Sequence, residues 1–336
     1  MNTVLRLPNW LGDVVMALPA ARAIVRHFEG ARVTVAGPAS VTPIFAERTG
    51  LDGVAVLTLP GGRKAQAAVL RAGGFGVAVL FTNSFGSAWV ARAAGIAERW
   101  GYRTDWRRVL LTRSVPTPRG RVHQADYYRA LALALGAARD EGPPAIAVGE
   151  ASLARARARL VAAGWDPARP LVGFAPGAAY GHAKRWPPAR VAEVIARLAR
   201  ERGAAAVLVG APGDRDAARA IESSRAAAGA IDLVGQTDLR EAMGVVAHCR
   251  AFVTNDSGAM HLAAAMGVPV TAVFGSTDER VTAPVGAHDV LTAPVFCRPC
   301  MLRECPIDHR CMKRISSDMV YDAVIRQLDR APERSR

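Results

Sequence analysis

One stretch near the start of the chain places a carboxylate between two apolar segments. It reads LPNWLGD, residues 7–13, and it follows a run typical of a buried strand and precedes a run typical of an apolar helix. Asp13, its last residue, could cap the helix by accepting from backbone N–H groups. A carboxylate at a strand end could equally take a proton in a reaction. These residues alone leave both roles open.

A second stretch gathers several polar groups at the end of a predicted strand. The sequence AFVTNDSGAMHLAAAMG, residues 251–267, brings Asn255, Asp256, Ser257 and Gly258 to the start of a predicted helix, with His261 four residues after Ser257. Free N–H groups at a helix start attract phosphate, and a glycine lets a ligand approach the backbone. Singly, Asp256 could be a cap and His261 an ordinary half-buried histidine. Together these residues favour a binding site.

A third stretch combines glycines with two basic residues. The sequence GFAPGAAYGHAKRWP, residues 173–187, follows another predicted strand and ends in Lys184 and Arg185, just before a predicted helix. Lysine occurs only at positions 64, 184 and 313, whereas arginine is the usual basic residue of this chain. A compact ammonium group at this place suits a diphosphate. A solvated basic loop is the alternative interpretation.

The next predicted strand ends in a similar turn. It reads GAPGDRD, residues 210–216. Asp214 could accept from a ribose or sugar hydroxyl, but capping of the following helix is the simpler expectation.

Four of the five cysteines lie close together near the end of the chain. They are Cys297, Cys300, Cys305 and Cys311, with His309 among them. Clustered cysteines in a chain expected to be cytoplasmic favour metal over disulfides. The spacing lacks the paired CxxC form of common zinc sites, so a structural zinc, reduced thiols and disulfides all stay open.

The elements that must position these residues alternate along the whole chain. Short β-branched runs are separated by longer alanine-rich helical patterns, which is typical of parallel sheets covered by helices. Predicted strands cover residues 3–7, 32–36, 54–57, 77–81, 171–175, 205–209, 231–234, 251–254 and 270–274. Predicted helices cover residues 12–28, 151–163, 188–202, 214–227, 239–249 and 257–266.

A break in this alternation predicts the domain boundary. Residues 140–144 read as a linker, because two prolines after a glycine cannot continue a helix. We therefore expect two doubly wound α/β domains, residues 1–145 and 146–336. Such domains have their sites at the carboxyl ends of the strands and are expected to face each other across a cleft.

Composition and charge limit the class of partner. The 336 residues hold 43 basic and 29 acidic side chains, a net charge of +14 that is spread over both halves. This charge suits an anionic partner, although a general arginine bias is an alternative explanation. No run reaches the roughly 18 apolar residues of a membrane helix, and a cytoplasmic protein without a secretory signal is expected. Aromatic residues make up only 6%, which argues against nucleic acid.

Three of these stretches together resemble a known family. LPNWLGD at residues 7–13, AKRWP at residues 183–187 and TNDSGxMH at residues 254–261 are similar to motifs of the lipopolysaccharide heptosyltransferases of glycosyltransferase family 9. The likeness covers nearly the whole chain, and the motifs follow in the same order. It implies the GT-B fold, in which a first Rossmann-like domain binds the acceptor and a second one binds the nucleotide sugar.

The resemblance also implies a reaction, the inverting transfer of L-glycero-D-manno-heptose from ADP-heptose to the first heptose of the lipopolysaccharide inner core. Asp13 is the implied general base, and Lys184 is implied to bind the diphosphate. Asn9, Trp10 and Gly12 form the implied acceptor loop. The implied donor-binding residues, besides Lys184, are Gly177, Ala178, Asp214, Asp256, Ser257, Gly258 and His261.

Cofactor and location follow from the same resemblance. Such folds need no bound metal for catalysis, and the cysteine cluster, which only some members carry, could hold at most a structural zinc. The acceptor lies at the cytoplasmic face of the inner membrane. We therefore expect peripheral binding to that anionic surface through Arg103, Arg107 and Arg108 beside Trp106. A GT-B enzyme with another donor or acceptor, and a non-catalytic nucleotide-binding protein with a decayed site, are the alternatives.

Overall fold

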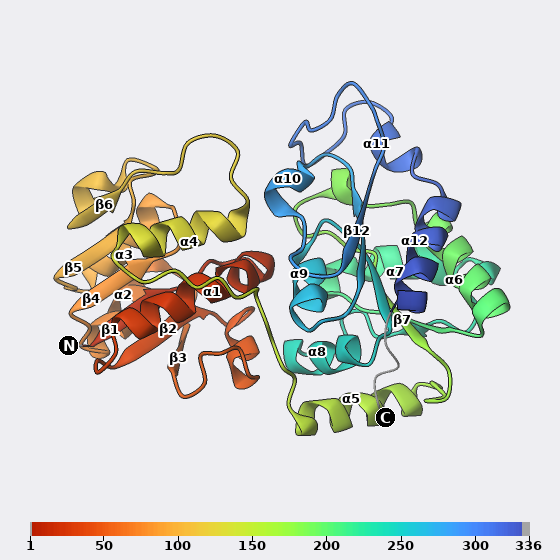
Figure 1. The fold of residues 1–336 in the computed structure, drawn as a ribbon, viewed down its shortest axis with the longest axis horizontal. Coiled ribbons are helices and arrows are strands. Elements are labelled where there is room, and N and C mark those ends of the chain that lie inside the picture. Colours follow the sequence, from red (N-terminus) through yellow and green to blue (C-terminus); the bar gives the residue numbers. More distant parts are fainter. Residues whose placement is uncertain (1, 331–336) are drawn as a thin grey trace. The chain divides into compact units, whose positions relative to one another are not determined.

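The structure is a computed structural model that describes residues 2–330. The chain divides into two compact units, Met1–Ala147 and Val148–Arg336. In Figure 1 the described part of the first unit runs from red to yellow-green, and that of the second unit runs from yellow-green to blue. This division lies two residues beyond the boundary predicted after residue 145. The predicted linker belongs to the first unit, because its first residue, Asp140, is bound there by Arg22 and Arg26.

Six parallel strands form the sheet of the first unit, in the order β3-β2-β1-β4-β5-β6. The two central strands are buried along their full length, as expected for a parallel sheet with helices on both faces. The strands are β1 (Thr3–Arg6), β2 (Val33–Pro38), β3 (Ala55–Leu59), β4 (Val77–Leu80), β5 (Glu98–Tyr102) and β6 (Arg113–Val115).

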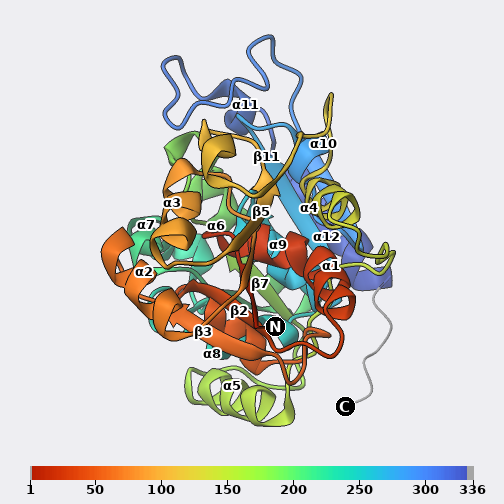
Figure 2. The same ribbon diagram turned by 90° about the vertical axis from the view of Figure 1, so that its left-hand side faces the viewer.

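Helices cover both faces of this first sheet. Figure 2 shows α2 and α3 on one side and α1 and α4 on the other. Because side chains alternate along a strand, Val4, Ala78 and Leu80 all pack with Leu70 of α2 and Ala88 of α3. The helices are α1 (Leu11–His27), α2 (Arg63–Ala72), α3 (Phe85–Ala93) and α4 (Gln124–Ala134), with short 3-10 turns at Thr42–Ala46 and Arg107–Leu110.

The second unit repeats the strand order of the first. Its six parallel strands run β12-β11-β10-β7-β8-β9, so each sheet has its first and fourth strands side by side at the centre. The strands are β7 (Leu171–Ala175), β8 (Ala205–Leu208), β9 (Ile231–Asp232), β10 (Ala251–Asn255), β11 (Val270–Phe274) and β12 (His288–Thr292).

Two apolar cores lie on the faces of the second sheet. One joins the sheet to α6, α7 and α12, and the other joins it to α5, α8 and α9. The helices are α5 (Glu150–Ala162), α6 (Pro188–Arg202), α7 (Arg215–Glu222), α8 (Leu239–Ala247), α9 (Gly258–Ala265), α10 (Glu279–Thr282), α11 (Arg310–Lys313) and α12 (Ser317–Arg330). Short 3-10 turns lie at His182–Lys184, Pro212–Asp214 and Arg225–Ala227.

The predicted fold class, two doubly wound parallel sheets, is confirmed. All nine predicted strands are present, but β5, β6 and β12 were missed because charged and polar residues interrupt their apolar patterns. The helix predicted over residues 214–227 ends at Glu222, and a 3-10 turn follows it. None of the helices within residues 2–330 combines the length and the apolar composition that a membrane crossing requires.

The shared strand order creates one special position in each sheet. In the first sheet, β2 and β3 lie on one side of β1, and β4 to β6 lie on the other side. In the second sheet, β8 and β9 lie on one side of β7, and β10 to β12 lie on the other side. The strand order therefore reverses between β1 and β4 and between β7 and β10. In doubly wound sheets, ligands bind outside the carboxyl ends of the strands at this switch point. The stretch at residues 7–13 follows β1, the loop at residues 176–187 follows β7, and Asp256 follows β10. All three predicted site segments therefore lie at switch points.

Candidate active site

Asp256 is the centre of the site in the second unit. Lys184 Nζ donates to Asp256 Oδ2 at 2.6 Å, and Thr277 Oγ1, three residues beyond β11, donates to the same oxygen at 2.6 Å. The side chains of Lys184 and Asp256 are only 12% and 5% exposed. The centroid of the Tyr180 ring lies 4.7 Å from Lys184 Nζ. Because an ammonium group has three N–H donors, Lys184 can bind a phosphate oxygen while Asp256 fixes its position.

Asn255, the last residue of β10, attaches the lysine loop to the sheet. Its Nδ2 donates to the carbonyls of Pro176 at 2.7 Å and Gly177 at 3.2 Å, and its Oδ1 accepts from Trp186 N at 3.0 Å. The side chain is 2% exposed, so these bonds replace its contacts with water. Asn255 was predicted to reach the start of the helix together with Asp256, but neither Asn255 nor Thr277 was assigned a role in the site. Its amide at the end of an apolar strand was the signal that could have assigned one to Asn255.

Gly177 lies against the carboxylate of Asp214. A Cβ at position 177 would lie 1.9 Å from Asp214 Cγ, so only glycine fits there. Asp214 Oδ2 accepts from Ala211 N at 3.1 Å, and Asp214 Oδ1 lies 3.8 Å from Arg185 Nη2. Asp214 is the N-cap residue of α7, as expected, but its side chain bonds to Ala211 N before the 3-10 turn and makes no cap bond to α7 itself. Ala178 is 3% exposed, which leaves its backbone as its means of contact with a ligand.

Helix α9 begins beside Asp256 without a side-chain cap. Its N-cap residue is Ser257, not Asp256, and the Ser257 hydroxyl pairs with Thr254 Oγ1 at 3.1 Å instead of capping. The first residue of the helix is Gly258. Uncapped N–H groups at a helix start can bind a phosphate. His261 lies in the same helix and is 5% exposed. Asp256, Ser257 and Gly258 therefore lie together at the end of β10, with His261 in the first turn of α9.

The segment that holds the clustered cysteines supports the loop that carries Lys184. Ala183 N, beside Lys184, donates to Arg303 O at 2.9 Å. His309 Nε2 lies 2.9 Å from Ala183 O, which makes a second hydrogen bond to the same residue. A Cβ at Gly181 would lie 2.3 Å from Arg303 O, so the backbone of the lysine loop and the backbone of the cysteine segment also approach closely at this glycine. Residues of this segment thus fix the backbone next to Lys184.

A structural zinc at Cys297, Cys300, Cys305 and Cys311 is one of the three possibilities that the sequence leaves open. All four are free thiols, as is Cys249. Within residues 2–330, no group of three or more histidine, cysteine, aspartate or glutamate side chains is arranged to hold a metal ion. Cys311 is instead buried in the core with α6 and α12, and burial raises the pKa of its thiol. This cysteine contributes packing.

Asp13 lies in the first turn of α1, at the switch point of the first unit. The N-cap residue of α1 is Trp10, and no side-chain cap bond is present. Asp13 is therefore not the N-cap residue of this helix but a carboxylate in its first turn. Gly12 is buried and Trp10 is 59% exposed, while the Asp13 side chain is half-buried. The carboxylate is held at the end of β1, where the fold class places ligands.

A buried arginine shapes the loop that precedes Asp13. Arg6, the last residue of β1, donates to Leu7 O and, at 2.8 Å, to Asn9 Oδ1. Arg6 is 7% exposed, and burial lowers the pKa of its guanidinium to about 10, so it stays charged at neutral pH. Its bond to Asn9 fixes the predicted acceptor loop. A charged residue in an otherwise apolar strand was the missed signal for this role.

Arg107 does not lie on the surface predicted to face a membrane. It is completely buried, and it donates to Tyr102 O at 2.7 Å, to Thr82 O, and to Ser87 Oγ at 3.3 Å. Burial lowers the pKa of its guanidinium to about 10. Arg107 therefore joins β5, α3 and the loop after β4, since backbone carbonyls and a hydroxyl accept from its Nε and Nη1, while its buried Nη2 has no hydrogen-bond partner.

The neighbours of Arg107 are exposed, as predicted. Trp106 is 91% exposed and Val109, which was not predicted, is 76% exposed. Arg103 and Arg108 also lie on the surface. We call these four residues the Trp106 patch. Its combination of an indole, a valine and two guanidinium groups is amphipathic.

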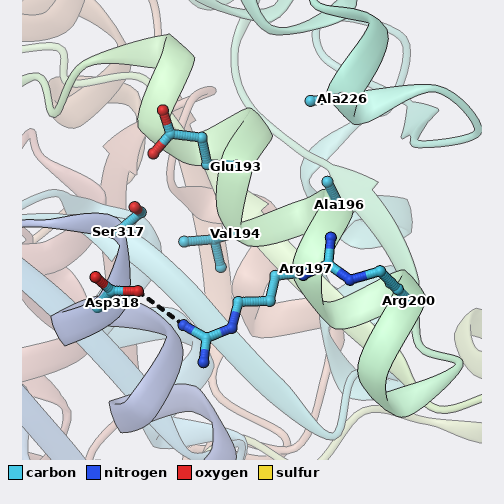
Figure 3. A pocket seen from close by; sticks show the side chains of 8 residues that line it. All are labelled: Glu193, Val194, Ala196, Arg197, Arg200, Ala226, Ser317 and Asp318. Atoms are coloured by element: carbon cyan, nitrogen blue, oxygen red, sulfur yellow. Dashed lines mark hydrogen bonds and ion pairs between the residues drawn. The ribbon is translucent and has the colours of Figure 1, made fainter.

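A cavity elsewhere in the second unit contains none of the predicted site residues. It measures about 290 Å³ and is bordered by α6 and α12 (Figure 3). Arg197 Nη1 and Asp318 Oδ1 form an ion pair of 2.8 Å at its wall. Its lining residues are Glu193, Val194, Ala196, Arg197, Arg200, Ala226, Ser317 and Asp318. The polar groups at the switch points, not this cavity, therefore define the candidate active site.

Two doubly wound sheets with polar sites at their switch points are the architecture of a GT-B glycosyltransferase. The chain belongs to glycosyltransferase family 9 (heptosyltransferase), whose sequence profile matches residues 63–310. The resemblance predicted from the motifs is thereby confirmed.

Within this family, the chain is similar to proteins named heptosyltransferase 2 or II. The chain is 32% identical over 297 residues to lipopolysaccharide heptosyltransferase 2 of Salmonella typhimurium, with 83% of this chain and 84% of the relative covered. It is 31% identical over 311 residues to lipooligosaccharide heptosyltransferase 2 of Haemophilus ducreyi, with 84% of this chain and 86% of the relative covered. The solved structure of E. coli ADP-heptose lps heptosyltransferase II matches with a TM-score of 0.83 and 27% identity over 98% of both chains.

Proposed function

We propose that this glycosyltransferase transfers L-glycero-D-manno-heptose from ADP-heptose to the first heptose of the lipopolysaccharide inner core, with inversion at the anomeric carbon. The donor in this proposal is supported by the name of the E. coli structure that the chain resembles. The observation that carries the proposal is the buried Lys184–Asp256 pair of 2.6 Å beside the start of α9.

The second unit supplies the donor site in this proposal. Lys184 and the N–H groups at the start of α9 bind the diphosphate and stabilise the negative charge that grows on it as ADP leaves. Asp256 holds the ammonium group in place, and Asn255 holds the loop that carries it. The remaining donor contacts are assigned to Gly177, Ala178, Asp214, Ser257, Gly258 and His261.

The first unit supplies the base. Asp13 accepts the proton of the acceptor hydroxyl while that oxygen attacks the anomeric carbon of the donor. The new glycosidic C–O bond forms as the bond between the anomeric carbon and the ADP phosphate oxygen breaks, and the electron pair leaves with ADP. This single displacement inverts the anomeric centre and needs no covalent enzyme intermediate. Asn9, Trp10 and Gly12 shape the approach of the acceptor.

We propose that the transfer needs no bound metal, since a lysine and a helix start provide positive charge where the diphosphate leaves. Turnover in excess EDTA should equal turnover in its absence. A loss that added divalent cation restores would contradict this part of the proposal.

We also propose that the enzyme binds peripherally to the anionic cytoplasmic face of the inner membrane, where its acceptor lies. The net charge of +14 and the Trp106 patch support this location. An exposed indole favours the boundary between headgroups and acyl chains, and arginines favour anionic headgroups.

The direct test supplies the protein with ADP-heptose and a lipid A core acceptor that carries one heptose. We expect release of ADP and a gain in acceptor mass of one heptose. Release of nucleotide only from another sugar nucleotide would identify a related glycosyltransferase with a different donor. No release with any donor and core acceptor would indicate a decayed site.

A further inference from the structure

The cysteine segment, residues 293–309 between β12 and α11, carries apolar side chains that face solvent. Figures 1 and 2 show it, in blue, projecting beyond the sheet and helices of the second unit. Most of the large apolar side chains that are exposed in the described part of this unit lie here. They are Phe296 at 80%, Met301 at 54%, Leu302 at 45% and Ile307 at 52% exposure. We call these four residues the Phe296 group.

The backbone of the cysteine segment is nevertheless attached to the rest of the unit. Arg298, 12% exposed, donates from Nε to Gly275 O at 2.9 Å, and Met301 N donates to Ser276 O at 2.8 Å, so both bonds go to the loop after β11. The hydrogen bonds to the lysine loop form a second attachment. The Phe296 group is therefore exposed on a segment that is held in place. Apolar area kept in water in this way favours a partner that covers it.

Basic side chains lie beside the Phe296 group. Arg310 Cζ lies 5.3 Å from the centroid of the Phe296 ring, and Arg314 Nη1 donates to Pro294 O at 3.4 Å. Arg303 and Lys313 are exposed. Residues 293–314 hold five arginine and lysine side chains against two carboxylates. The projecting surface thus combines apolar side chains with an excess of positive charge.

This charge decides which partner the surface fits. In a two-fold dimer, the same surface of a second copy would cover the Phe296 group, and the basic residues around it would face like charges. An anionic bilayer offers apolar chains to the Phe296 group and phosphates to the arginines and lysine. Only the second partner compensates both features of the surface.

We propose that the Phe296 group docks the donor-binding unit on an anionic lipid bilayer. Its four side chains enter the boundary between headgroups and acyl chains, while the neighbouring basic residues bind headgroup phosphates. This surface is separate from the Trp106 patch, which belongs to the first unit, so each unit has a membrane contact of its own. The inference rests on the proposed function, because it requires an acceptor that lies in the membrane.

The test compares two double variants in vesicle cosedimentation. Phe296→Ser with Ile307→Ser removes two members of the Phe296 group, and Val161→Ser with Met319→Ser removes two exposed apolar side chains of α5 and α12. On vesicles of phosphatidylglycerol and phosphatidylcholine, the first variant should bind about tenfold more weakly than the wild type, because two apolar side chains no longer enter the bilayer. The second should bind like the wild type. Both should keep the wild-type Tm, since all four side chains are exposed.

The charge is tested by Lys313→Glu. Its binding to vesicles that contain phosphatidylglycerol should weaken, whereas its binding to phosphatidylcholine alone should not change. Unchanged binding to the anionic vesicles would contradict the role given to the basic residues.

Two outcomes would overturn the proposal. One is equal vesicle binding by the two double variants. The other is a wild-type oligomer in sedimentation velocity that Phe296→Ser with Ile307→Ser converts to a monomer without loss of vesicle binding, since a second copy would then cover the surface. Vesicle binding needs neither a sugar nucleotide nor an acceptor. A failure of the proposed transfer reaction is therefore read from the transfer assay and is distinct from both outcomes.

Discussion

Lys184 Nζ and Asp256 Oδ2 lie 2.6 Å apart, although 72 positions separate the two residues in the chain. Both side chains are largely buried, and Thr277 donates to the same carboxylate oxygen. Removal of one member of a buried ion pair leaves the other charge uncompensated. The pair therefore both stabilises the loop after β7 and supplies the cation for the proposed diphosphate site.

Lys184→Ala should lower kcat about a hundredfold to a thousandfold, as does the loss of a preorganised donor that stabilises a developing charge. The affinity for ADP should fall as well, because the proposed lysine contact is made to ADP itself. Steady-state kinetics and ADP titration measure the two effects. Lys64→Ala, at an exposed lysine of α2, is the control and should match the wild type. Unchanged ADP affinity in Lys184→Ala would exclude the proposed diphosphate contact.

Gly177→Ala should disturb the same loop by a steric route. The added methyl group would overlap the Asp214 carboxylate, which forces the loop or Asp214 to move. We expect a loss of stability of about 1–3 kcal/mol, typical of overpacking, and a raised KM for the donor. The control is Gly213→Ala, where an added Cβ meets no atom within 4 Å. If Gly177→Ala and Gly213→Ala had the same Tm and the same KM for the donor, the close packing of Gly177 against Asp214 would be refuted.

Asp140 predicts a dependence of stability on pH. Its side chain is 8% exposed and contacts Arg22 at 3.0 Å and Arg26 at 2.8 Å. Burial alone would raise the pKa of Asp140, but hydrogen bonds from the two arginines outweigh it and lower the pKa from 3.8 to about 2. A carboxyl with a lowered pKa stabilises the fold above its unfolded pKa. That contribution, about 2 kcal/mol, is lost as the pH falls from about 4 to about 2.

Asp140→Asn should therefore cost most of this stability at pH 7 and much less at pH 2. Thermal or urea unfolding at the two pH values measures the difference. Glu141→Gln is the matched control, because the Glu141 side chain is 73% exposed. Equal losses for Asp140→Asn at both pH values would mean that its charge is not the source of the stability.

The Trp106 patch predicts how the protein binds vesicles. Binding to vesicles that contain phosphatidylglycerol should exceed binding to phosphatidylcholine, and it should weaken near 1 M salt, where the Debye length is about 3 Å. The double variant Trp106→Ser with Val109→Ser should bind less, since two exposed apolar side chains are lost. Val161→Ser, at an exposed valine of α5, is the control. Cosedimentation that neither salt nor the double variant reduces would exclude this patch.

Local signals predicted much of the fold and the positions of the site segments. The helix predicted over residues 188–202 is observed as Pro188–Arg202, because a proline begins it and Gly203 ends it in the left-handed region, with φ of 61°. The strand that delivers Asp256 was predicted because β-branched and apolar residues precede a polar turn. Helix ends and strand patterns of this kind depend on residues that are adjacent in the sequence.

Partners distant in sequence could not be predicted in the same way. Arg107, beside Arg108 and Trp106, has the local pattern of a surface residue. It is buried because acceptors 5 to 25 positions away, in β5, in α3 and in the loop after β4, meet its guanidinium. The contact of Asp256 with Lys184 likewise depends on which strands become neighbours. The motifs indicated where a site lies but not which contacts hold its side chains.

The central claim is that Asp13 accepts the proton of the acceptor hydroxyl. Asp13→Asn keeps the size of the side chain and removes its basicity, so kcat for heptose transfer should fall about a hundredfold to ten-thousandfold. The Kd for ADP should stay at the wild-type value, because the proposed ADP contacts lie in the second unit. Asp126→Asn, in α4 with a side chain 51% exposed, is the control and should keep full activity. Measured together, a lost kcat with an unchanged ADP Kd supports the base assignment, and an Asp13→Asn enzyme that retains wild-type kcat contradicts it.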